Sequence, residues 1–471
     1  MIILKKIAAV ILAAGASTRM GEPKQLLDWK GAPLLAHIAD IALAAEFSPV
    51  IAVLGCHAEA AHTALGLRPI QSVMNWRWKE GLSTSVQTGL AALPFETEAA
   101  IFLQCDQPLI TSRLLQTVAA RFEETNAPIV HLSHSGQRST PVLFARSLFS
   151  ELTAVSGDEG GRAIIARRSD ESAAVEVANP DRLIDIDTAA DYQRALATHG
   201  AQQTRSCLSN IRHLIVDIDG VLWHGDEPMP GLQDFFAFLR QHKIGFILAT
   251  NNSSRTPEQY AAKLARFGVQ IPAERVLTSG QATASYLTTI APPRTRVYAI
   301  GRKGLRQALV EHDFVVTDED AAYVIVGWDR RLTWSKMKTA ALLIHGGAKF
   351  IGSNPDKSFP TELGPVPGNG AQLAMLEATT GVAPTIVGKP ESRMYKEALR
   401  RMGARAESTA MIGDRVGTDI VGAARAGLIS VLLLSGISTE ADVAASPVKP
   451  DMVYAGIEDF TQAWAVALDE T

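Results

Sequence analysis

Leu214-Ile215-Val216-Asp217-Ile218-Asp219-Gly220-Val221-Leu222 is the stretch that indicates the fold most clearly. An apolar run that ends in carboxylates is typical of a buried strand in a parallel sheet, with its polar end at the sheet edge. Because side chains alternate along a strand, Asp217 and Asp219 point the same way. Two like charges so close are costly unless a cation or a shared proton compensates them. The alternative is an Asp-Gly turn after a strand, which is common in itself.

Similar apolar runs recur along the chain, with amphipathic stretches between several of them. They are Ala8 to Leu12, Val50 to Leu54, Ala99 to Leu103, Ile244 to Leu248, Val297 to Ile300, Val324 to Val326 and Val431 to Leu434. Strands that alternate with helices predict parallel sheets covered on both faces, so we expect α/β domains. The chain has 471 residues, enough for about three modules of roughly 150 residues.

The composition excludes several classes of protein. Apolar residues make up 47% of the chain and charged residues 20%, as in globular proteins with an ample core and unlike disordered or fibrous chains. The net charge is −4, so no positive field attracts nucleic acid, and we expect no nucleic-acid partner. Cys56, Cys105 and Cys207 are far apart and odd in number, which indicates thiols in a reducing compartment.

The N-terminus allows two interpretations. Lys5 and Lys6 precede the apolar run Ile7 to Ala16, which superficially resembles a signal peptide. However, the run is short and continues into the polar, glycine-bearing loop Gly15 to Gly21, as a buried strand leading into a phosphate loop would. No other stretch approaches the ~20 apolar residues of a membrane span. We therefore expect a cytoplasmic protein with no membrane partner.

The loop after the first apolar run has the residues of a phosphate site. Small residues from Ala13 to Ala16 let backbone N–H groups approach phosphate oxygens. Arg19 and Lys24 can neutralise a triphosphate and its leaving pyrophosphate. The loop does not fit the P-loop template, and a structural turn with solvated cations is the alternative.

Acidic residues follow at two further places. Asp106 comes directly after an apolar strand, where α/β sheets bind ligands, and it suits Mg²⁺ held jointly with phosphate. Asp185 and Asp187 lie on one face of an extended segment, so both could approach the same metal. The alternative is that one of them caps the helix beginning near Ala189.

As a set, the motifs of the first half resemble the MobA-like nucleotidyltransferases, most closely the molybdenum cofactor cytidylyltransferases. The resemblance covers about Ile7 to Leu196 and rests on Leu12 to Gly21, Lys24 to Leu27, Asn75, Trp78, Glu80 and Gly81, Ser85, Asp106 to Pro108, Gly157 and Asp158, Arg162, and Asp185 to Thr188. It implies a Rossmann-like fold with Mg²⁺ on Asp106 and Asp187 and phosphates on Arg19 and Lys24. It also implies that the base lies against Leu12, Ala13, Ala14, Gly15 and the loop from Gly81 to Ser85.

Two positions bear on the substrates that this resemblance implies. Ala14 stands where guanylyl-transferring relatives have a second glycine, which favours CTP over GTP. Ser139-Thr140-Pro141 stands where the cofactor enzymes usually have Gly-His-Pro, on the acceptor side. This departure favours a phosphorylated sugar or polyol as acceptor in place of molybdopterin. Cytidylylation of the molybdenum cofactor is the alternative.

Three further motifs accompany Asp217 and Asp219. Phe246 to Asn252 ends a strand in the Thr250 hydroxyl and the Asn251 amide, which are good donors to a phosphoryl group. Gly388-Lys389-Pro390 supplies a cation, and Met411 to Asp419 supplies an acidic loop. From about Ile211 to near the C-terminus, this order resembles the haloacid dehalogenase superfamily, specifically its NagD-like (IIA) phosphatases.

This second resemblance implies a role for each motif. Asp217 would be the nucleophile and Asp219 the general acid/base, with Thr250, Asn251 and Lys389 on the phosphate. Mg²⁺ would be held by Asp217, Asp414 and the backbone carbonyl of Asp219, with Asp419 orienting these ligands from behind. The resemblance further implies a cap that closes over the site, with Asn354 to Asp356 near the substrate.

We therefore expect a MobA-like domain over residues 1–198, a linker over 199–209, a phosphatase core over 210–288 and 384–471, and an inserted α/β cap of the C2 type over 289–383. The combination predicts a bifunctional enzyme with Mg²⁺ at both sites, which uses CTP or another NTP and a small phosphorylated metabolite. The alternative from another class is that one half only binds ligands. The oligomeric state stays open, a homo-oligomer included.

Overall fold

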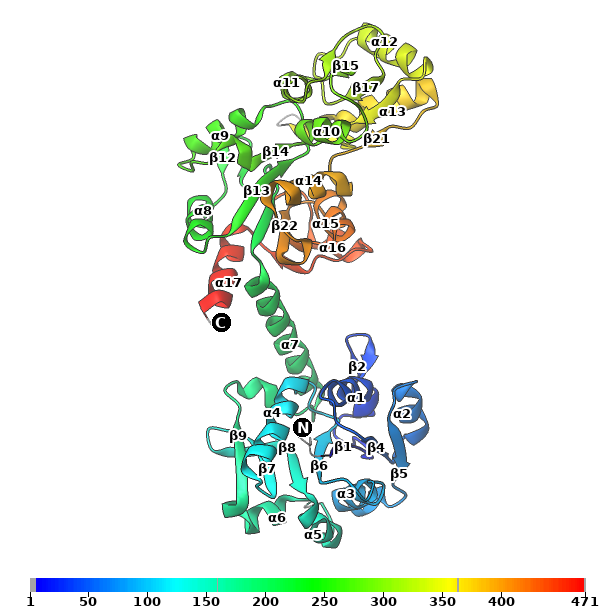
Figure 1. Ribbon diagram of the computed structural model, residues 1–471, viewed down its shortest axis with the longest axis vertical. Helices are drawn as coiled ribbons and strands as arrows, with labels where there is room; N and C mark the ends of the chain where they lie inside the picture. Colours follow the sequence, from blue (N-terminus) through cyan, green and yellow to red (C-terminus); the bar gives the residue numbers. More distant parts are fainter. Residues whose placement is uncertain (1–5, 159, 362–363, 470–471) are drawn as a thin grey trace. The chain divides into compact units, whose positions relative to one another are not determined.

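The apolar runs of the sequence form the central strands of two α/β units, which confirms the predicted fold class. The computed structural model describes residues 6–158, 160–361 and 364–469. The chain divides between Gln202 and Gln203 (Figure 1). Each unit is described by itself below.

The N-terminal unit is built on a seven-stranded sheet with the order β5-β4-β1-β6-β8-β7-β9. Its strands are β1 (Ile7–Ala13), β4 (Val50–Leu54), β5 (Gln71–Met74), β6 (Ala99–Gln104), β7 (Ile129–His134), β8 (Gln137–Ala145) and β9 (Ser172–Glu176), and a small hairpin joins β2 (Asp28–Trp29) to β3 (Ala32–Pro33). Its helices are α1 (Leu34–Ala44), α2 (Ala58–Leu65), α3 (Leu82–Ala91), α4 (Ser112–Thr125), α5 (Phe149–Ala154) and α6 (Arg162–Arg167). Strand β1 pairs with β4 on one side and β6 on the other, so the chain reverses its direction of travel across the sheet here. Ligands of open α/β sheets bind at such a switch point.

Both faces of this sheet are buried, as the continuous apolar runs predict. Ile11 and its neighbours on the same face pack with α1 and α4, for example against Leu35 and Leu115. Val10 faces the opposite way and packs with Val86 of α3. Alternate residues of one strand thus belong to different cores, which is why the strand is apolar throughout.

The sheet is mixed, whereas the sequence predicts parallel strands. Strand β8 runs antiparallel to both β6 and β7. The reason is a two-residue turn between β7 and β8, in which Ser135 and Gly136 have φ values of 50° and 79°. Positive φ at both positions favours a tight antiparallel hairpin, and no crossover helix fits into so short a connection.

The segment 199–209, which the sequence assigns to a linker, is helical. It forms the second half of α7 (Ala189–Asn210), and the boundary between the units falls inside this helix. The segment contains no proline, and Ala201, Gln202 and Gln203 have good helix propensity. Its polarity therefore reflects a solvated helix rather than irregular chain.

The C-terminal unit contains a six-stranded parallel core sheet with the order β14-β13-β10-β22-β23-β24. The strands are β10 (His213–Val216), β13 (Gly245–Thr250), β14 (Val276–Thr278), β22 (Thr409–Gly413), β23 (Ile429–Leu433) and β24 (Met452–Tyr454), and the hairpin β11 (Trp223–His224) with β12 (Glu227–Pro228) follows β10. The helices are α8 (Leu232–Gln241), α9 (Pro257–Arg266), α10 (Ser279–Thr288), α14 (Ser392–Met402), α15 (Val421–Ala426), α16 (Glu440–Ala445) and α17 (Ile457–Asp469). Strand β10 lies between β13 and β22, so the end of β10 is the switch point of this sheet.

A second sheet, inserted between β14 and β22, forms the predicted cap (Figure 1). Its strand order is β16-β15-β17-β18-β21, and all the pairings are parallel. The elements are β15 (Arg296–Ile300), β16 (Val315–Val316), β17 (Tyr323–Val326), β18 (Lys349–Gly352), β21 (Thr385–Ile386), α11 (Lys303–Glu311), α12 (Trp334–His345), α13 (Asn369–Thr380) and the hairpin β19 (Ser358–Thr361) with β20 (Gly364–Pro367).

The cap extends further along the chain than the sequence predicts. Thr385 and Ile386 were expected in the core, but they form β21 and pair with Ile351 and Gly352 of β18. A two-residue edge strand is too short to give a recognisable apolar run, so its pairing partner is not evident from sequence. The chain therefore returns to the core after Ile386.

Within the described ranges, no helix combines the length and apolar character needed to cross a membrane.

Candidate active sites

Three carboxylates meet at the switch point of the C-terminal unit. Asp217 follows β10, while Asp414 and Asp419 follow β22, the strand beside it. One oxygen from each lies within 4.8 Å of the others, and all three residues are buried. Neighbouring parallel strands end at the same sheet edge, so the topology itself produces this cluster. The sequence predicts Asp217 and Asp414 as metal ligands with Asp419 behind them; the structure brings all three together, and the role of each stays a prediction.

Lys389 supplies the positive charge of this site. Its side chain is only 2% exposed, and Nζ lies 2.7 Å from Asp217 Oδ1 and 2.7 Å from Asp419 Oδ1. Burial opposes the charged form of Lys389, but the two carboxylates outweigh it and raise the pKa of Lys389. The ammonium group is therefore charged at neutral pH and can attract a phosphoryl group to Asp217.

Asp219, the predicted general acid/base, and Thr250, a predicted phosphate ligand, lie at or just after the ends of neighbouring strands. Thr250 ends β13 beside β10, is buried, and accepts a hydrogen bond at Oγ1 from the Asn252 N–H (3.1 Å). Asp219 is exposed, but the protein around it and the nearby Asp217 raise its pKa. A carboxyl group with a raised pKa suits a general acid, the role that the family resemblance implies for Asp219.

The Asn251 side chain makes its hydrogen bonds inside the protein. Its Oδ1 accepts a hydrogen bond from the Lys389 N–H (2.8 Å). Its Nδ2 donates to the Lys389 carbonyl (3.0 Å) and to Asp356 Oδ1 (3.2 Å). Both amide hydrogens are thus used inside the protein, and the side chain holds the backbone of Lys389 in place; phosphate binding by Asn251 stays a prediction.

The donor set fits a divalent cation. Asp414 Oδ2 accepts a hydrogen bond from the Ile437 N–H (2.9 Å), while the buried Oδ1 has no hydrogen-bond partner in the part of the chain that the structure describes. Burial and the charges of Asp217 and Asp419 raise the pKa of Asp414. Carboxylate oxygens are the ligands that Mg²⁺ prefers, and a cation would both satisfy Oδ1 and reduce this repulsion. The carbonyl of Asp219 as a further ligand stays a prediction.

A glycine turn allows this close approach. Gly220 has φ +87°, and a Cβ at this position would lie 2.4 Å from Asp414 Oδ2. Only glycine combines a left-handed backbone with this small distance.

One segment of the cap, Asn354 to Asp356, contacts Asn251 at the end of β13, and its place near the substrate stays a prediction. The Asn354 side chain donates from Nδ2 to the Asn251 carbonyl (2.7 Å), and Asp356 accepts from the Asn251 side chain. Burial raises the pKa of Asp356, although Arg415 opposes this. The loop after β18 is therefore joined by hydrogen bonds to the end of β13.

The N-terminal unit has its own charged cluster at the switch point beside β1. Lys24 Nζ lies 2.6 Å from Asp187 Oδ1 and 3.1 Å from Asp106 Oδ2. Arg19 Nη1 lies 3.1 Å from Asp187 Oδ2. Burial disfavours the charged Lys24, but the bonds to Asp187 and Asp106 outweigh it and raise the pKa of Lys24. The structure thus brings together the four charged residues to which the sequence assigns phosphate and metal binding.

This cluster also fits a divalent cation. Asp106 Oδ1 is buried and, among the described residues, has no hydrogen-bond partner. Burial, together with the charges of Asp106 and Asp187, raises the pKa of Asp185 to about 6, although a hydrogen bond from Gln107 acts in the opposite direction. Asp106 and Asp187 both act on the charge of Asp185, so the choice between Asp185 and Asp187 as a metal ligand, which the sequence leaves open, also stays open here.

The predicted base site is built from backbone at the ends of β1 and at the start of α3. Ala13 and Ala14 are buried, Leu12 is half-buried and Gly15 is exposed. Gly81 precedes α3 with φ +109°, and a Cβ there would lie 2.6 Å from the carbonyl of Gly157. The buried Ser85 hydroxyl accepts a hydrogen bond from Asn75 Nδ2 (2.9 Å), which joins the start of α3 to the segment after β5. Nucleotide binding by these residues stays a prediction.

The position that departs from the family motif makes a specific contact. The Gln107 Nε2 donates to Thr140 Oγ1 (2.7 Å), and Gln107 is 2% exposed. Because Gln107 also bonds to Asp185, Thr140 is connected to the acidic cluster through one side chain. The sequence names Gln107 only as part of a motif, since nothing in one sequence indicates its partner.

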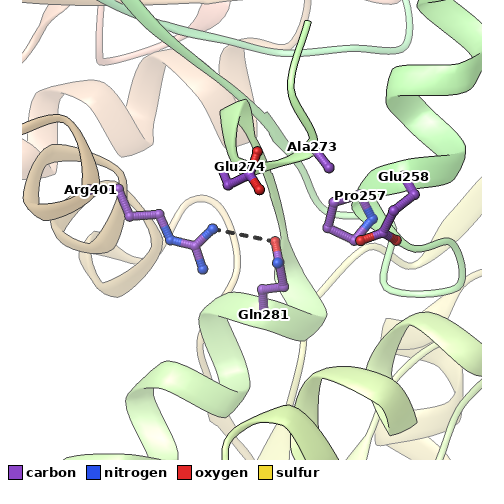
Figure 2. Close-up of a pocket in the computed structure, with 6 residues that line it drawn as sticks. All are labelled: Pro257, Glu258, Ala273, Glu274, Gln281 and Arg401. Carbon is purple, nitrogen blue, oxygen red and sulfur yellow. Dashed lines mark hydrogen bonds between the residues drawn. The ribbon is translucent and has the colours of Figure 1, made fainter.

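A surface pocket of about 420 Å³ in the C-terminal unit is separate from the residues named above (Figure 2). It is lined by Pro257, Glu258, Ala273, Glu274, Gln281 and Arg401. Arg401 donates from Nη1 to Gln281 Oε1 across it at 3.5 Å, and its Nε is paired with Glu397. Arg401 and Gln281 thus bind each other, and no residue to which we assign catalysis lines this pocket.

Comparisons with known proteins agree with this division. The model of the MobA-like NTP transferase domain matches residues 9–173. The haloacid dehalogenase-like hydrolase model matches residues 214–315, and a HAD-hydrolase-like model matches residues 386–460. The matches flank the cap and leave out much of it.

Relatives of the C-terminal unit are phosphatases. The dihydroxyacetone phosphatase of Corynebacterium glutamicum (strain R) is 39% identical over 255 residues, which are 54% of this chain and 92% of the relative. The acid sugar phosphatase of Staphylococcus saprophyticus is 34% identical over 253 residues, which are 54% of this chain and 97% of the relative. The glycerol phosphate phosphatase of Mycobacterium tuberculosis, solved in complex with calcium, has a TM-score of 0.51 and 31% identity over 54% of this chain and 75% of its own.

Both resemblances inferred from the motifs are confirmed. The chain belongs to the haloacid dehalogenase-like hydrolases through its NagD-like C-terminal unit, and its N-terminal unit is a MobA-like NTP transferase domain.

Proposed function

We propose that the chain is a bifunctional enzyme. Its C-terminal unit hydrolyses a phosphate monoester with Mg²⁺, and its N-terminal unit transfers a cytidylyl group from CTP to a small phosphorylated acceptor. The observation that carries this proposal is the pair of charged clusters, each with a lysine between carboxylates at the switch point of a parallel sheet region. Positioning and charge neutralisation are the main requirements of both reactions.

In the hydrolase reaction, Asp217 attacks phosphorus, and the bond from phosphorus to the ester oxygen breaks. Asp219 donates a proton to the leaving oxygen, then removes one from the water that attacks the aspartyl phosphate, so that inorganic phosphate leaves and Asp217 is regenerated. Lys389 and Thr250 hold the phosphoryl oxygens during both steps. Mg²⁺ held by Asp217, Asp414 and the backbone carbonyl of Asp219, with Asp419 orienting these ligands, would neutralise phosphoryl charge.

In the transferase reaction, a phosphate oxygen of the acceptor attacks the α-phosphorus of CTP. The new phosphorus–oxygen bond forms as the bond to the β-phosphate oxygen breaks, and pyrophosphate leaves. Lys24 and Arg19 release Asp187 to bind phosphate oxygens, which is a change of partner that a charged ligand can drive. Mg²⁺ on Asp106 with Asp187 or Asp185 supplies neutralisation of the triphosphate.

Several observations support these substrates. Ala14 favours a cytosine nucleotide through the family resemblance, and Thr140 in place of histidine favours an acceptor other than molybdopterin. Three relatives of the C-terminal unit are named as phosphatases of small metabolites, namely of dihydroxyacetone, of sugars and of glycerol phosphate. The two reactions would thus belong to one pathway that handles a phosphosugar or phosphopolyol and its CDP-linked form.

The test uses two single variants of the full chain. Asp217→Asn should abolish phosphate release from monoesters and leave pyrophosphate formation intact, and Asp106→Ala should do the reverse. Because Asp217→Asn also protects phosphorylated acceptors from hydrolysis, it is the protein for a panel of NTPs against phosphosugars, phosphopolyols and molybdenum-loaded pterin. Turnover only with the pterin would replace our acceptor by the molybdenum cofactor. If none of the acceptors gives pyrophosphate, the N-terminal unit is reduced to a binding module.

A further inference from the structure

A short turn links Asp219 to a tryptophan four residues later. The Trp223 Nε1 donates a hydrogen bond to Asp219 Oδ1 at 2.8 Å. The Gly220 N–H donates to the Trp223 carbonyl at 2.9 Å and closes the same turn. The indole N–H and the carboxylate are therefore fixed to one small loop after β10.

The indole itself is packed against side chains of α9. Trp223 is 1% exposed, and its ring stacks on Tyr260 with 6.3 Å between centroids and 14° between planes. The ammonium of Lys263 lies 4.6 Å from the Trp223 ring centroid. Lys263 is itself 5% exposed and pairs with Asp226 at 3.2 Å. The direction of the N–H bond is thus determined by packing, independently of Asp219.

We propose that Trp223 is a positioning residue for Asp219, an inference that rests on the phosphatase function proposed above. The N–H bond occupies Oδ1, so Oδ2 is the oxygen that carries the proton. Oδ2 gives this proton to the leaving oxygen as the ester bond breaks, and takes one from the attacking water in the second step. The charge that remains on Asp219 between these steps is stabilised by the N–H, because hydrogen bonds to ionised groups are the strong ones.

Leaving groups that differ in basicity test this role. An alkoxide needs a proton in order to leave, whereas 4-nitrophenolate is stable as an anion and does not. In Trp223→Phe, kcat/KM for glycerol phosphate should fall by about 10- to 100-fold, mostly through kcat, while kcat/KM for 4-nitrophenyl phosphate should change by less than about 3-fold. A merely structural loss would lower the two values by the same factor.

Trp464→Phe is the matched control. Trp464 is fully buried in the same unit, and its Nε1 has no hydrogen-bond partner among the residues that the structure describes. This variant removes the same atoms from a core, so it should keep the wild-type ratio of the two kcat/KM values. If Trp223→Phe fails to fold, the benzothienyl analogue of tryptophan at position 223, with sulfur in place of the N–H, keeps the shape of the ring.

The outcomes distinguish a failure of the positioning role of Trp223 from a failure of the proposed phosphatase function. A selective loss on glycerol phosphate in Trp223→Phe or in the analogue supports the inference. Equal losses on both substrates, or none on either, overturn it while wild-type hydrolysis leaves the phosphatase function standing. A wild-type protein that hydrolyses neither ester overturns the proposed function and this inference with it.

Discussion

Lys389→Met removes the cation that lies between two carboxylates of the C-terminal site. Lys389 is 2% exposed and Asp419 is fully buried, so the variant leaves buried negative charges without their partner. Breaking a buried ion pair from one side costs about 3–5 kcal/mol in the free energy of unfolding. We expect a loss of this size at neutral pH, together with a fall in hydrolysis of at least about 100-fold.

Magnesium should return part of the lost stability. Asp217, Asp414 and Asp419 remain in Lys389→Met, and a cation bound to them replaces the missing positive charge. A ligand at 100 times its dissociation constant stabilises the folded state by about 2.7 kcal/mol. Calorimetry of the full chain with Mg²⁺ and with a chelator should therefore show a larger Mg²⁺-dependent increase in Tm for the variant than is seen for Lys336→Met.

Lys336→Met is the control for this experiment because it also leaves a buried carboxylate unpaired. Lys336 Nζ lies 2.6 Å from Asp329, which is 4% exposed and belongs to the cap. This variant should lose stability without gaining any response to Mg²⁺. The reasoning is refuted if Lys389→Met unfolds within about 1 kcal/mol of the wild type, or if Mg²⁺ stabilises it no more than the control.

Three further variants test other parts of the molecule. Glu397→Gln should reduce the free energy of unfolding by at most about 3 kcal/mol. Burial opposes the charge of Glu397, but Arg400 and Arg401 outweigh it and lower its pKa to about 2. The stabilisation by Glu397 is therefore present above its unfolded pKa, and in acid denaturation the difference between variant and wild type should vanish as pH falls through about 2. Gly220→Ala should abolish hydrolysis and weaken Mg²⁺ binding measured by titration calorimetry, because its Cβ would meet Asp414 at 2.4 Å; unchanged affinity would contradict this. Lys24→Met should lower pyrophosphate formation by at least about 100-fold and leave phosphate release within about 2-fold of wild type, and equal losses in both assays would count against separate sites.

Much of both sites could be predicted because it depends on local pattern. The order of apolar runs brings Asp106, Asp217 and Asp414 to sheet edges, whereas strand alternation does not apply to Asp217 and Asp219, because β10 ends at Val216. In each unit a lysine then forms ion pairs with two of the carboxylates. This is the level at which a single sequence is informative.

The remainder depends on contacts between residues far apart in the chain. An amide at the end of a strand is typical of a phosphate donor, but the Asn251 side chain is hydrogen-bonded to the backbone of Lys389, 138 positions later. The antiparallel β8 and the helical segment 199–209 were missed for a different reason. Each follows from backbone preferences of a few residues that hydrophobic periodicity does not report.

The position of β21 has a practical consequence for engineering. This edge strand pairs with β18 of the cap and ends at Ile386, three residues before Lys389, whose backbone is held by Asn251. In a chimera that takes its cap from another phosphatase and is joined at residue 383, the donor's cap sheet would lose the edge strand that corresponds to β21. The splice belongs after Ile386, where the graft keeps all of its strands and the recipient keeps its lysine.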